Sequence, residues 1–375
     1  MANVLILGGG FGGVVAAETL ATNLIHEHQV TLVSRNDRFL FYPALVRLAF
    51  GECDIADISF DLRKAMTDRR VRFIKAEVAR ISPGYHHATL THGEVEGEMP
   101  YDYLIFALGR RLATEKVRGF YEHANHLLTP EAALKFGEAV ASFHKGHAII
   151  GNCSEAKLPI PVFETAFALS RRLRERGERD ACRITVINPN MASLEEFGGR
   201  ELATKLYRIL EEHGIEYVAD FPVSEVTARE VKTFDSHTLA YDLLMLLPPF
   251  AGVGSVVDTG ITDSKNFIRV NHSMRVIDVQ RMYAVGDSTN LRGAETAHMS
   301  VRQAEVAAAN VQAEIEGRTP SAKYEHEIRS VIDEGGRDSI YLRRLWTNEG
   351  GDIRQGRVWR WAKLVQEKIW MLTHS

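Results

Sequence analysis

The sequence predicts an α/β protein with two Rossmann-like dinucleotide-binding domains and a C-terminal module. A strand, a glycine-rich turn and a helix open the chain, and the same order returns in its middle. Each half also closes with a similar phrase, and the two phrases, Tyr101-Asp102-Tyr103-Leu104-Ile105 and Tyr241-Asp242-Leu243-Leu244-Met245, begin 140 residues apart. Solenoid repeats have periods of roughly 20 to 50 residues, so this spacing indicates a duplicated domain.

In both halves an apolar run precedes a turn, a stretch of helical periodicity and a second β-branched run. The first half is expected to form a strand over 4–7, a helix over 11–24 and a strand over 30–33. The second half is expected to form a strand over 147–150, a helix over 162–176 and a strand over 183–187. Both patterns are βαβ units.

The chain then returns to the first domain and ends in a different module. Strands are expected over 267–270 and 282–285, followed by an alanine-rich helix over 297–314 that stops before Gly317. The predicted domains are residues 1–112 with 253–316 for the first, residues 113–252 for a second, NAD-like domain, and residues 317–375 for the C-terminal module.

The composition is that of a packed protein without an unusual partner. Of 375 residues, 45% are hydrophobic and 25% charged, and the net charge of -4 offers no cationic field for nucleic acid. Three cysteines are too few for a secreted disulfide framework, and the scattered histidines predict no metal site. No signal peptide or membrane-spanning run is found. We expect a cytoplasmic protein, free or peripheral on the inner face of the cell membrane.

The turn Gly8-Gly9-Gly10-Phe11-Gly12-Gly13 has the spacing of a dinucleotide fingerprint. Gly8 allows a tight turn, Gly10 lets the backbone approach a pyrophosphate, and Gly13 lets the helix pack on the strand. The helix N-terminus then directs unpaired N–H groups at the phosphates. Because strand, turn and helix agree, we expect Phe11 and Gly12 also to lie at a bound dinucleotide.

The ribose position departs from the fingerprint. An acidic residue is expected roughly 20 residues after the turn, but the second strand ends at Ser34-Arg35. Ser34 offers one weaker hydrogen bond. Arg35 either stacks on adenine and reaches a phosphate, or is a solvated surface charge.

Several segments together resemble the two-dinucleotide-domain flavoproteins of the pyridine nucleotide-disulfide oxidoreductase superfamily. They are residues 8–13, 37–45, 101–109 and 282–287. Within that superfamily the chain is most similar to sulfide:quinone oxidoreductases and type II NADH dehydrogenases. The similarity extends to Pro248-Pro249-Phe250 and, in the tail, to Trp361-Ala362-Lys363 and Glu367-Lys368-Ile369-Trp370.

The resemblance implies FAD in the first domain. It places Asp287 on the ribityl chain, where a carboxylate accepts hydrogen bonds from hydroxyls and Gly286 permits close approach; the alternative is a turn capped by Asp287. It places Pro43 beside the isoalloxazine and Ala107-Leu108-Gly109 over the middle of the cofactor. Thr296-Ala297-His298 would begin a helix at the pyrimidine edge, where the helix dipole favours the anionic reduced flavin.

The matching turn of the second half lacks the fingerprint. Residues 151–161 contain one glycine, Gly151, and two prolines, which have no N–H to donate. The strand that follows ends at Ile187-Asn188-Pro189, without an acidic ribose partner. The sequence thus disfavours productive NADH binding, which is a further similarity to the sulfide:quinone enzymes.

Two side chains are candidates for chemistry beside the flavin. The sulfur-carrying cysteines of sulfide:quinone oxidoreductases have no match, because Leu128, Leu158 or Pro159, and Ser330 stand at the corresponding positions. Cys153 could supply a single thiol if a helix N-terminus lowered its pKa, or it is an inert buried cysteine. The resemblance places Glu164 near flavin and quinone, where a raised pKa would suit proton transfer; otherwise it is a charge stabilised by the helix dipole.

The tail predicts an amphipathic helix. Its apolar residues recur at helical spacing, at Val358, Trp361, Val365, Ile369 and Leu372, and all four tryptophans lie within the last 30 positions. Such a helix suits a lipid headgroup layer, or it packs on the chain's own core or across a homodimer.

We therefore expect an FAD-dependent oxidoreductase that resembles sulfide:quinone oxidoreductase and passes two electrons from a small donor through flavin to a quinone. Two alternatives are open. One is a type II NADH:quinone dehydrogenase, and the other is a flavin-binding scaffold or regulatory protein with little turnover.

Overall fold

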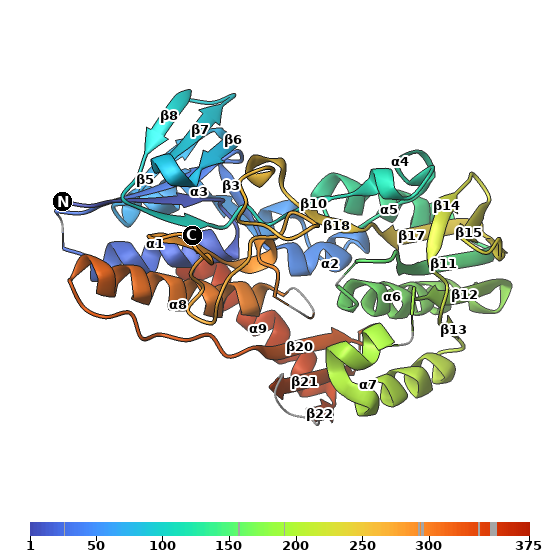
Figure 1. Cartoon of the computed structure of the whole chain (residues 1–375). Helices are drawn as coiled ribbons and strands as arrows, with labels where there is room; N and C mark the ends of the chain where they lie inside the picture. The colour runs from blue at the N-terminus through green and yellow to red at the C-terminus, as the bar shows by residue number, and fades with distance from the viewer. Residues whose placement is uncertain are drawn as a thin grey trace.

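The two halves of the chain form two parallel sheets, each with helices packed on it (Figure 1). The computed structural model describes residues 1–25, 27–156, 158–190, 192–291, 293, 296–336, 338–345 and 351–375, with the backbone alone at 192–194 and 196. Residue Trp346 of the predicted tail lies outside this range.

The first sheet has the order β19-β9-β1-β2-β5, and all its strands are parallel. The strands are β1 (Asn3–Leu7), β2 (Gln29–Ser34), β5 (Arg72–Lys75), β9 (Tyr103–Phe106) and β19 (Met282–Ala284). Helices α1 (Phe11–Asn23) and α8 (Ala297–Ile315) pack along each other on one face (Figure 1). An antiparallel sheet of β6 (Glu77–Ser82), β7 (His87–Thr91) and β8 (Gly97–Pro100) lies on the other side.

The second sheet repeats this plan with the order β13-β12-β11-β17. Its parallel strands are β11 (Gly146–Asn152), β12 (Cys182–Ile187), β13 (Glu216–Val218) and β17 (Leu243–Leu247). Helices α5 (Pro130–Ser142), α6 (Ile160–Arg176) and α7 (Ala192–Glu212) accompany it, with an antiparallel sheet of β14 (Val223–Val226), β15 (Glu230–Thr233) and β16 (Thr238–Ala240). The predicted duplication is confirmed strand by strand.

The aspartate of the repeated Tyr-Asp sequence forms the same pair of hydrogen bonds in both halves. The Asn3 N–H donates to Asp102 Oδ2 over 2.7 Å, and the Asp102 N–H donates to the Asn3 carbonyl over 2.9 Å. In the second half the His147 N–H donates to Asp242 Oδ2 over 2.8 Å, and the Asp242 N–H returns a 2.8 Å bond to the His147 carbonyl. Each aspartate therefore fixes the start of the first strand, β1 or β11, to the start of the neighbouring β9 or β17.

A two-stranded ribbon carries the chain between the sheets in both directions. It consists of β10 (Arg110–Leu112) and β18 (Phe250–Gly252), paired antiparallel. We propose that the domain boundaries lie here, after residues 112 and 252. The strand expected over 267–270 is wrong: Ile268 and Val270 form isolated bridges only, because the chain turns at Asn266, whose φ is 65°.

The C-terminal module contains an antiparallel sheet that the sequence did not predict. Its strands are β20 (Glu327–Asp333), β21 (Ser339–Leu345) and β22 (Asp352–Gln355), and the predicted helix follows as α9 (Arg357–His374). Ile332 and Ile340 are fully buried in one core with residues of α6. The module is thus packed on the second domain.

The remaining elements are short. They are β3 (Arg38–Leu40), α2 (Leu45–Ala49), β4 (Ser59–Asp61), α3 (Leu62–Asp68) and α4 (Phe120–His123), with 3₁₀ turns that include Tyr42–Ala44 and Gly286–Ser288.

Candidate cofactor site

The glycine turn after β1 is as tight as the fingerprint predicts. Gly8 has a φ of +113°, and a Cβ there would lie 2.1 Å from the Ala107 carbonyl oxygen. A Cβ on Gly13 would lie 1.8 Å from the Gly8 carbonyl oxygen. The protein's own backbone therefore requires both glycines.

Gly10 is different, because nothing in the described chain requires it to be glycine. Its φ of -86° is accessible to any residue, and a Cβ there would meet no described atom within 4 Å. Gly10 is also the N-cap of α1, so the amides of Phe11, Gly12 and Gly13 that follow have no partner within the helix. An exposed glycine in front of free amides fits a ligand that approaches the backbone closely.

The predicted ribose residues lie next to this turn. Ser34 is buried at the end of β2, and a Cβ on Gly9 would lie 2.8 Å from its Oγ. Its Oγ accepts a 3.3 Å hydrogen bond from the Asn36 N–H. Arg35 follows with an exposed side chain. Their contact with a ribose stays a prediction.

Asp287 lies at the same sheet edge and has a partner that the sequence did not reveal. Gly286, which follows β19 closely, has a φ of +69° and donates its N–H to Gln303 Oε1 over 2.6 Å. The Asp287 carboxylate forms an ion pair with Arg110, whose guanidinium carbon lies 3.7 Å from the centroid of the Phe250 ring. The only sequence signal for Arg110 was its position directly after Gly109.

The other predicted flavin contacts also surround the turn. The Ala107 N–H donates to the Leu7 carbonyl over 2.8 Å, and Gly109 has a φ of +68°. Pro43 follows Tyr42, whose ring centroid lies 5.4 Å from that of Phe11. These residues are therefore brought together as expected.

The start of α8 contains the last three predicted residues. Thr296 is its N-cap and accepts a 3.4 Å hydrogen bond from the Met299 N–H, and Ala297 is its first residue. His298 Nε2 lies 3.4 Å from Glu327 Oε2, and burial lowers the pKa of His298 despite this carboxylate. The His298 side chain is thus directed at β20.

The corresponding turn of the second half is closed by the protein itself. Strand β11 continues through Gly151 and Asn152, and the Cys153 N–H donates to the Leu247 carbonyl over 2.9 Å. Glu155 forms ion pairs with Lys116 at 2.7 Å and Lys265 at 2.6 Å. The turn thus carries its own anion and lacks an equivalent of Gly10.

Cys153 does not have the environment of a reactive thiol. It is fully buried, and this burial raises the pKa of its thiol. The idea that a helix N-terminus lowers this pKa is wrong, because α6 begins only at Ile160. Its catalytic role stays a prediction, and the environment favours the inert alternative.

Glu164 is a buried acid that contacts the tail helix. Its side chain in α6 is 6% exposed, and Oε1 accepts hydrogen bonds from Lys363 Nζ at 2.5 Å and from the Asp333 N–H at 2.9 Å. Burial raises the pKa of Glu164, while Lys363 opposes the rise. The predicted proton-relay residue is therefore half of a buried ion pair.

The inner face of α9 is held by ion pairs with the rest of the protein. Glu367 forms two hydrogen bonds of 2.7 and 2.8 Å with Arg47 Nη1, and Arg360 Nε lies 2.8 Å from Asp333 Oδ2. Near its end, the Trp370 ring lies 4.8 Å from that of Phe11. The helix therefore rests on the start of α1, beside the glycine turn.

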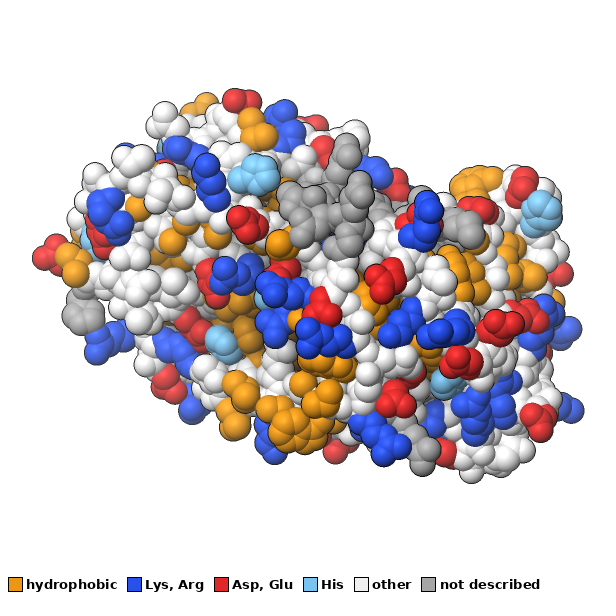
Figure 2. Space-filling model, turned by 90° about the horizontal axis from the view of Figure 1, so that it is seen from below, with side chains coloured by type: hydrophobic (Ala, Val, Ile, Leu, Met, Phe, Trp, Pro, Cys, Tyr) orange, Lys and Arg blue, Asp and Glu red, His pale blue; other side chains and the backbone are white. Residues whose placement is uncertain are grey.

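The outer face of α9 is apolar, which inverts the usual orientation of a surface helix. Val358, Trp361, Ile369 and Leu372 are 58% to 72% exposed. On the lower face of the molecule, where α9 lies, apolar side chains gather beside lysines and arginines (Figure 2). None of the described helices is long and apolar enough to cross a bilayer.

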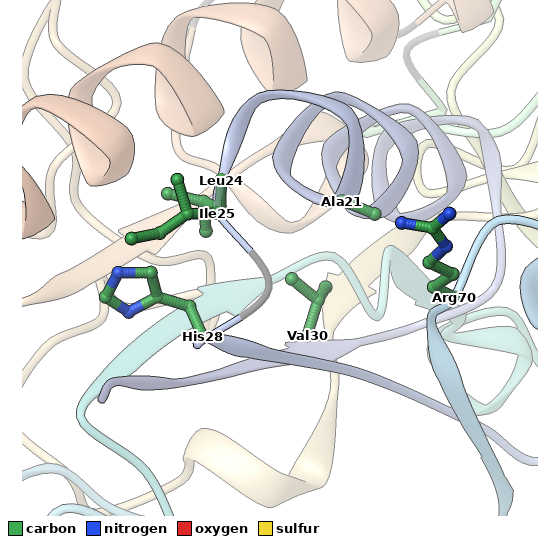
Figure 3. A pocket seen from close by; sticks show the side chains of 6 residues that line it. All are labelled: Ala21, Leu24, Ile25, His28, Val30 and Arg70. Carbon is green, nitrogen blue, oxygen red and sulfur yellow. The ribbon is translucent and has the colours of Figure 1, made fainter.

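A cavity of about 330 Å³ lies away from this site. It is lined by Ala21, Leu24, Ile25, His28, Val30 and Arg70, where α1 ends and β2 begins (Figure 3). The glycine turn is at the opposite end of α1, so this cavity is not part of it. Among the described residues, no group of three or more His, Cys, Asp or Glu could hold a metal ion.

Comparison with known proteins gives relatives over most of the chain. The chain is 27% identical over 296 residues to the sulfide-quinone reductase of Aquifex aeolicus, which covers 76% of this chain and 67% of that protein. It is 25% identical over 367 residues to the alternative NAD(P)H-ubiquinone oxidoreductase C1 of Arabidopsis thaliana, which covers 84% of this chain and 68% of that one.

Solved structures give the same fold. The sulfide:quinone oxidoreductase of Aquifex aeolicus superposes with a TM-score of 0.92 at 23% identity, over 100% of this chain and 91% of that one. NDH2 of Plasmodium falciparum, solved with NADH, gives a TM-score of 0.74 at 15% identity, over 97% and 94%. The model of the pyridine nucleotide-disulphide oxidoreductase family matches residues 2–304, and the chain therefore belongs to that family.

Proposed function

We propose that the protein is an FAD-dependent oxidoreductase that passes two electrons from a small donor to a quinone. The single observation that carries this proposal is Gly10, which stands exposed before the free amides of α1 although no described atom requires it to be glycine. Relatives named as sulfide-quinone and NAD(P)H-ubiquinone oxidoreductases support the quinone as acceptor. When bound, FAD supplies the two-electron chemistry.

The chain's own residues would bind and orient the cofactor. The amides of Phe11 to Gly13 face the pyrophosphate with the positive end of the α1 dipole. Asp287 accepts hydrogen bonds from ribityl hydroxyls, while Pro43 and Ala107 to Gly109 line the remainder. The cap at Thr296 places the α8 N-terminus where it favours added negative charge.

Glu164 would hold and transfer one of the two protons that a quinone takes up with two electrons. Its pKa is raised by burial, so it can take up a proton nearer neutral pH than an exposed glutamate. Lys363 Nζ, 2.5 Å away, donates a hydrogen bond to this carboxylate and fixes its position.

The closed turn of the second half supports a donor other than NADH. The Cys153 amide is already bonded to the Leu247 carbonyl, and residues 151–161 hold one glycine and two prolines, so few backbone N–H groups are left to bind a pyrophosphate there. Buried Cys153 also supports the scaffold alternative, because this thiol is not accessible to a sulfide donor.

Anaerobic mixing of the purified yellow protein separates these functions. We expect sulfide to bleach the flavin and a soluble quinone to restore its colour, with no fast bleaching at micromolar NADH. Prompt bleaching by NADH would establish the type II dehydrogenase instead. Bleaching by neither donor would favour the scaffold, and a protein that stays colourless after reconstitution with FAD would refute the whole proposal.

We further propose that α9 attaches the protein to a membrane surface, where a lipid-soluble quinone is available. Its exposed apolar stripe and the neighbouring Lys368 and Arg357 suit an anionic headgroup layer. In flotation with anionic liposomes, Trp361→Gln with Leu372→Gln should lower binding by about tenfold, since two apolar side chains no longer enter the lipid. Phe234→Gln, at a 77% exposed residue far along the chain, is the control.

Equal flotation of both variants and the unaltered protein would exclude α9 as the contact. A change of sedimentation from dimer to monomer in the α9 variant, without any liposome binding by the unaltered protein, would assign the stripe to a homodimer.

A further inference from the structure

We propose that Arg110 is a positioning residue for the cofactor, which holds the Asp287 carboxylate in its binding orientation and compensates its charge. This inference rests on the proposed binding of FAD. The family resemblance assigns a cofactor contact to Asp287 and none to Arg110. The role of Arg110 is inferred only from its contacts in the folded chain.

Arg110 is held from two sides. Its side chain is 8% exposed, and one end of the guanidinium forms an ion pair with Asp287, itself 16% exposed. The plane is fixed by the Phe250 ring, 3.7 Å from the guanidinium carbon. A planar group that is stacked and ion-paired at once has few alternative rotamers, and lysine cannot reproduce this geometry.

The carboxylate needs such a partner on electrostatic grounds. A poorly solvated anion is costly unless a cation or several hydrogen bonds compensate it. The site proposed here also receives a pyrophosphate with two negative charges. Arg110 makes the Asp287 pair neutral as a whole, so the carboxylate can accept hydrogen bonds from hydroxyls without repelling the phosphates.

Arg110 also connects the site to the interdomain ribbon. It lies in β10, where its backbone is in register with Gly252, and Phe250 lies two residues away in β18. The strands that join the two sheets thus set the position of a side chain at the cofactor edge.

The test compares Arg110→Met with Arg111→Met. Arg111 is the adjacent residue of the same strand, with a 43% exposed side chain paired to Glu115 at 2.6 Å. Apoprotein of each variant is titrated with FAD, and binding is followed by quenching of flavin fluorescence. Arg110→Met should bind FAD about 30-fold more weakly, as expected for loss of a charge-assisted hydrogen bond. Arg110→Lys should recover part of this loss, and Arg111→Met should bind like the unaltered protein.

A second measurement distinguishes positioning from general damage. Asp287→Asn should weaken binding by itself, but adding Arg110→Met to it should cost much less than 30-fold, because the asparagine carries no charge to compensate. Equal FAD affinity of Arg110→Met and Arg111→Met would overturn the inference. So would full additivity with Asp287→Asn. If the unaltered protein binds no FAD, the proposed function fails instead.

Discussion

The two halves of this protein share a scaffold and differ in the turn that follows their first strand. Both contain four parallel strands in the order fourth-first-second-third, to which the first sheet adds β19, and both use an aspartate, Asp102 or Asp242, to join the first strand to the fourth. In the first half the turn exposes Gly10 before a helix with free amides. In the second half the strand runs on through Asn152, and Glu155 with two lysines fills the turn.

This difference teaches that the Rossmann scaffold and its ability to bind a dinucleotide depend on separate residues. The sheet is maintained by strand burial and by the hydrogen bonds of Asp102 and Asp242, which lie at the starts of the strands and not at the turn that follows the first strand. Binding depends on a few backbone amides and on empty space above one glycine. A duplicated domain can therefore lose its ligand and retain its fold.

The helices that follow the two turns also differ, in the side chain buried at their fifth residue. The fifth residue of α1 is Val15, which is buried among apolar neighbours. The fifth residue of α6 is Glu164, which is buried and paired with Lys363. The second half has thus acquired a charge that the first half lacks.

The largest effect is expected when the buried carboxylate of Glu164 loses its cation. Lys363→Met should lower the free energy of unfolding by about 3 kcal/mol at pH 8, because it leaves Glu164 buried without a cation. The folded-state pKa of Glu164 is raised, so this carboxyl favours the folded state below its unfolded pKa, and that contribution is lost as the pH rises through the folded pKa. The loss in the variant should accordingly shrink at pH 5.5. Urea unfolding at both pH values measures it.

Lys368→Met, at an exposed lysine of the same helix, serves as the control and should leave the unfolding midpoint unchanged. Adding Glu164→Gln to Lys363→Met should restore most of the stability. A Lys363→Met protein as stable as the control would show that the Glu164–Lys363 pair makes no net contribution to the free energy of unfolding.

The next largest effect compares the same change, glycine to alanine, in the two turns. Gly10→Ala should lower the melting temperature of the apoprotein only slightly, since its Cβ meets no described atom within 4 Å and alanine is merely a poorer N-cap, but should weaken FAD binding by about 100-fold by occupying the ligand's space. Gly151→Ala should do the opposite. Its Cβ would lie 2.3 Å from Ile187 Cγ1, so the fold should lose about 2 kcal/mol while FAD affinity stays the same.

Thermal melts of the apoproteins and fluorescence titrations with FAD give both readouts. If Gly10→Ala destabilised the apoprotein as much as Gly151→Ala, the glycine would be structural and the central observation for FAD would lose its meaning.

The smallest effect is expected for the hydrogen bonds by which Asp102 and Asp242 join two strands. Asp102→Asn and Asp242→Asn should each cost about 1 kcal/mol, because each replaces a charged acceptor of a backbone N–H by a neutral one. Equal losses in chemical unfolding would sharpen the comparison. A loss of stability in only one of the two variants would contradict the comparison, because the two aspartates would then contribute differently to their sheets.

What the sequence could predict was local, and what it could not was long-range. The strands of the two βαβ units, the turn at Gly8 to Gly13 and helix α9 follow from short local patterns and are confirmed, whereas the strand expected over 267–270 is not. Arg110 and Asp287 are 177 residues apart, and Lys363 and Glu164 are 199 apart, so no local pattern reveals either pair. The sheet of β20 to β22 was missed for a related reason, since it is formed by a polar segment whose isoleucines are buried in one core with residues distant in the sequence, among them those of α6.

The position of β19 has a consequence for how the chain emerges from the ribosome. This strand, residues 282–284, completes the sheet that begins at Asn3, whereas the sheet of the second half is contained within residues 146–247. During synthesis the later domain can therefore close before the earlier one does. Until β19 is made, the edge of β9 lacks the strand that covers it in the folded protein.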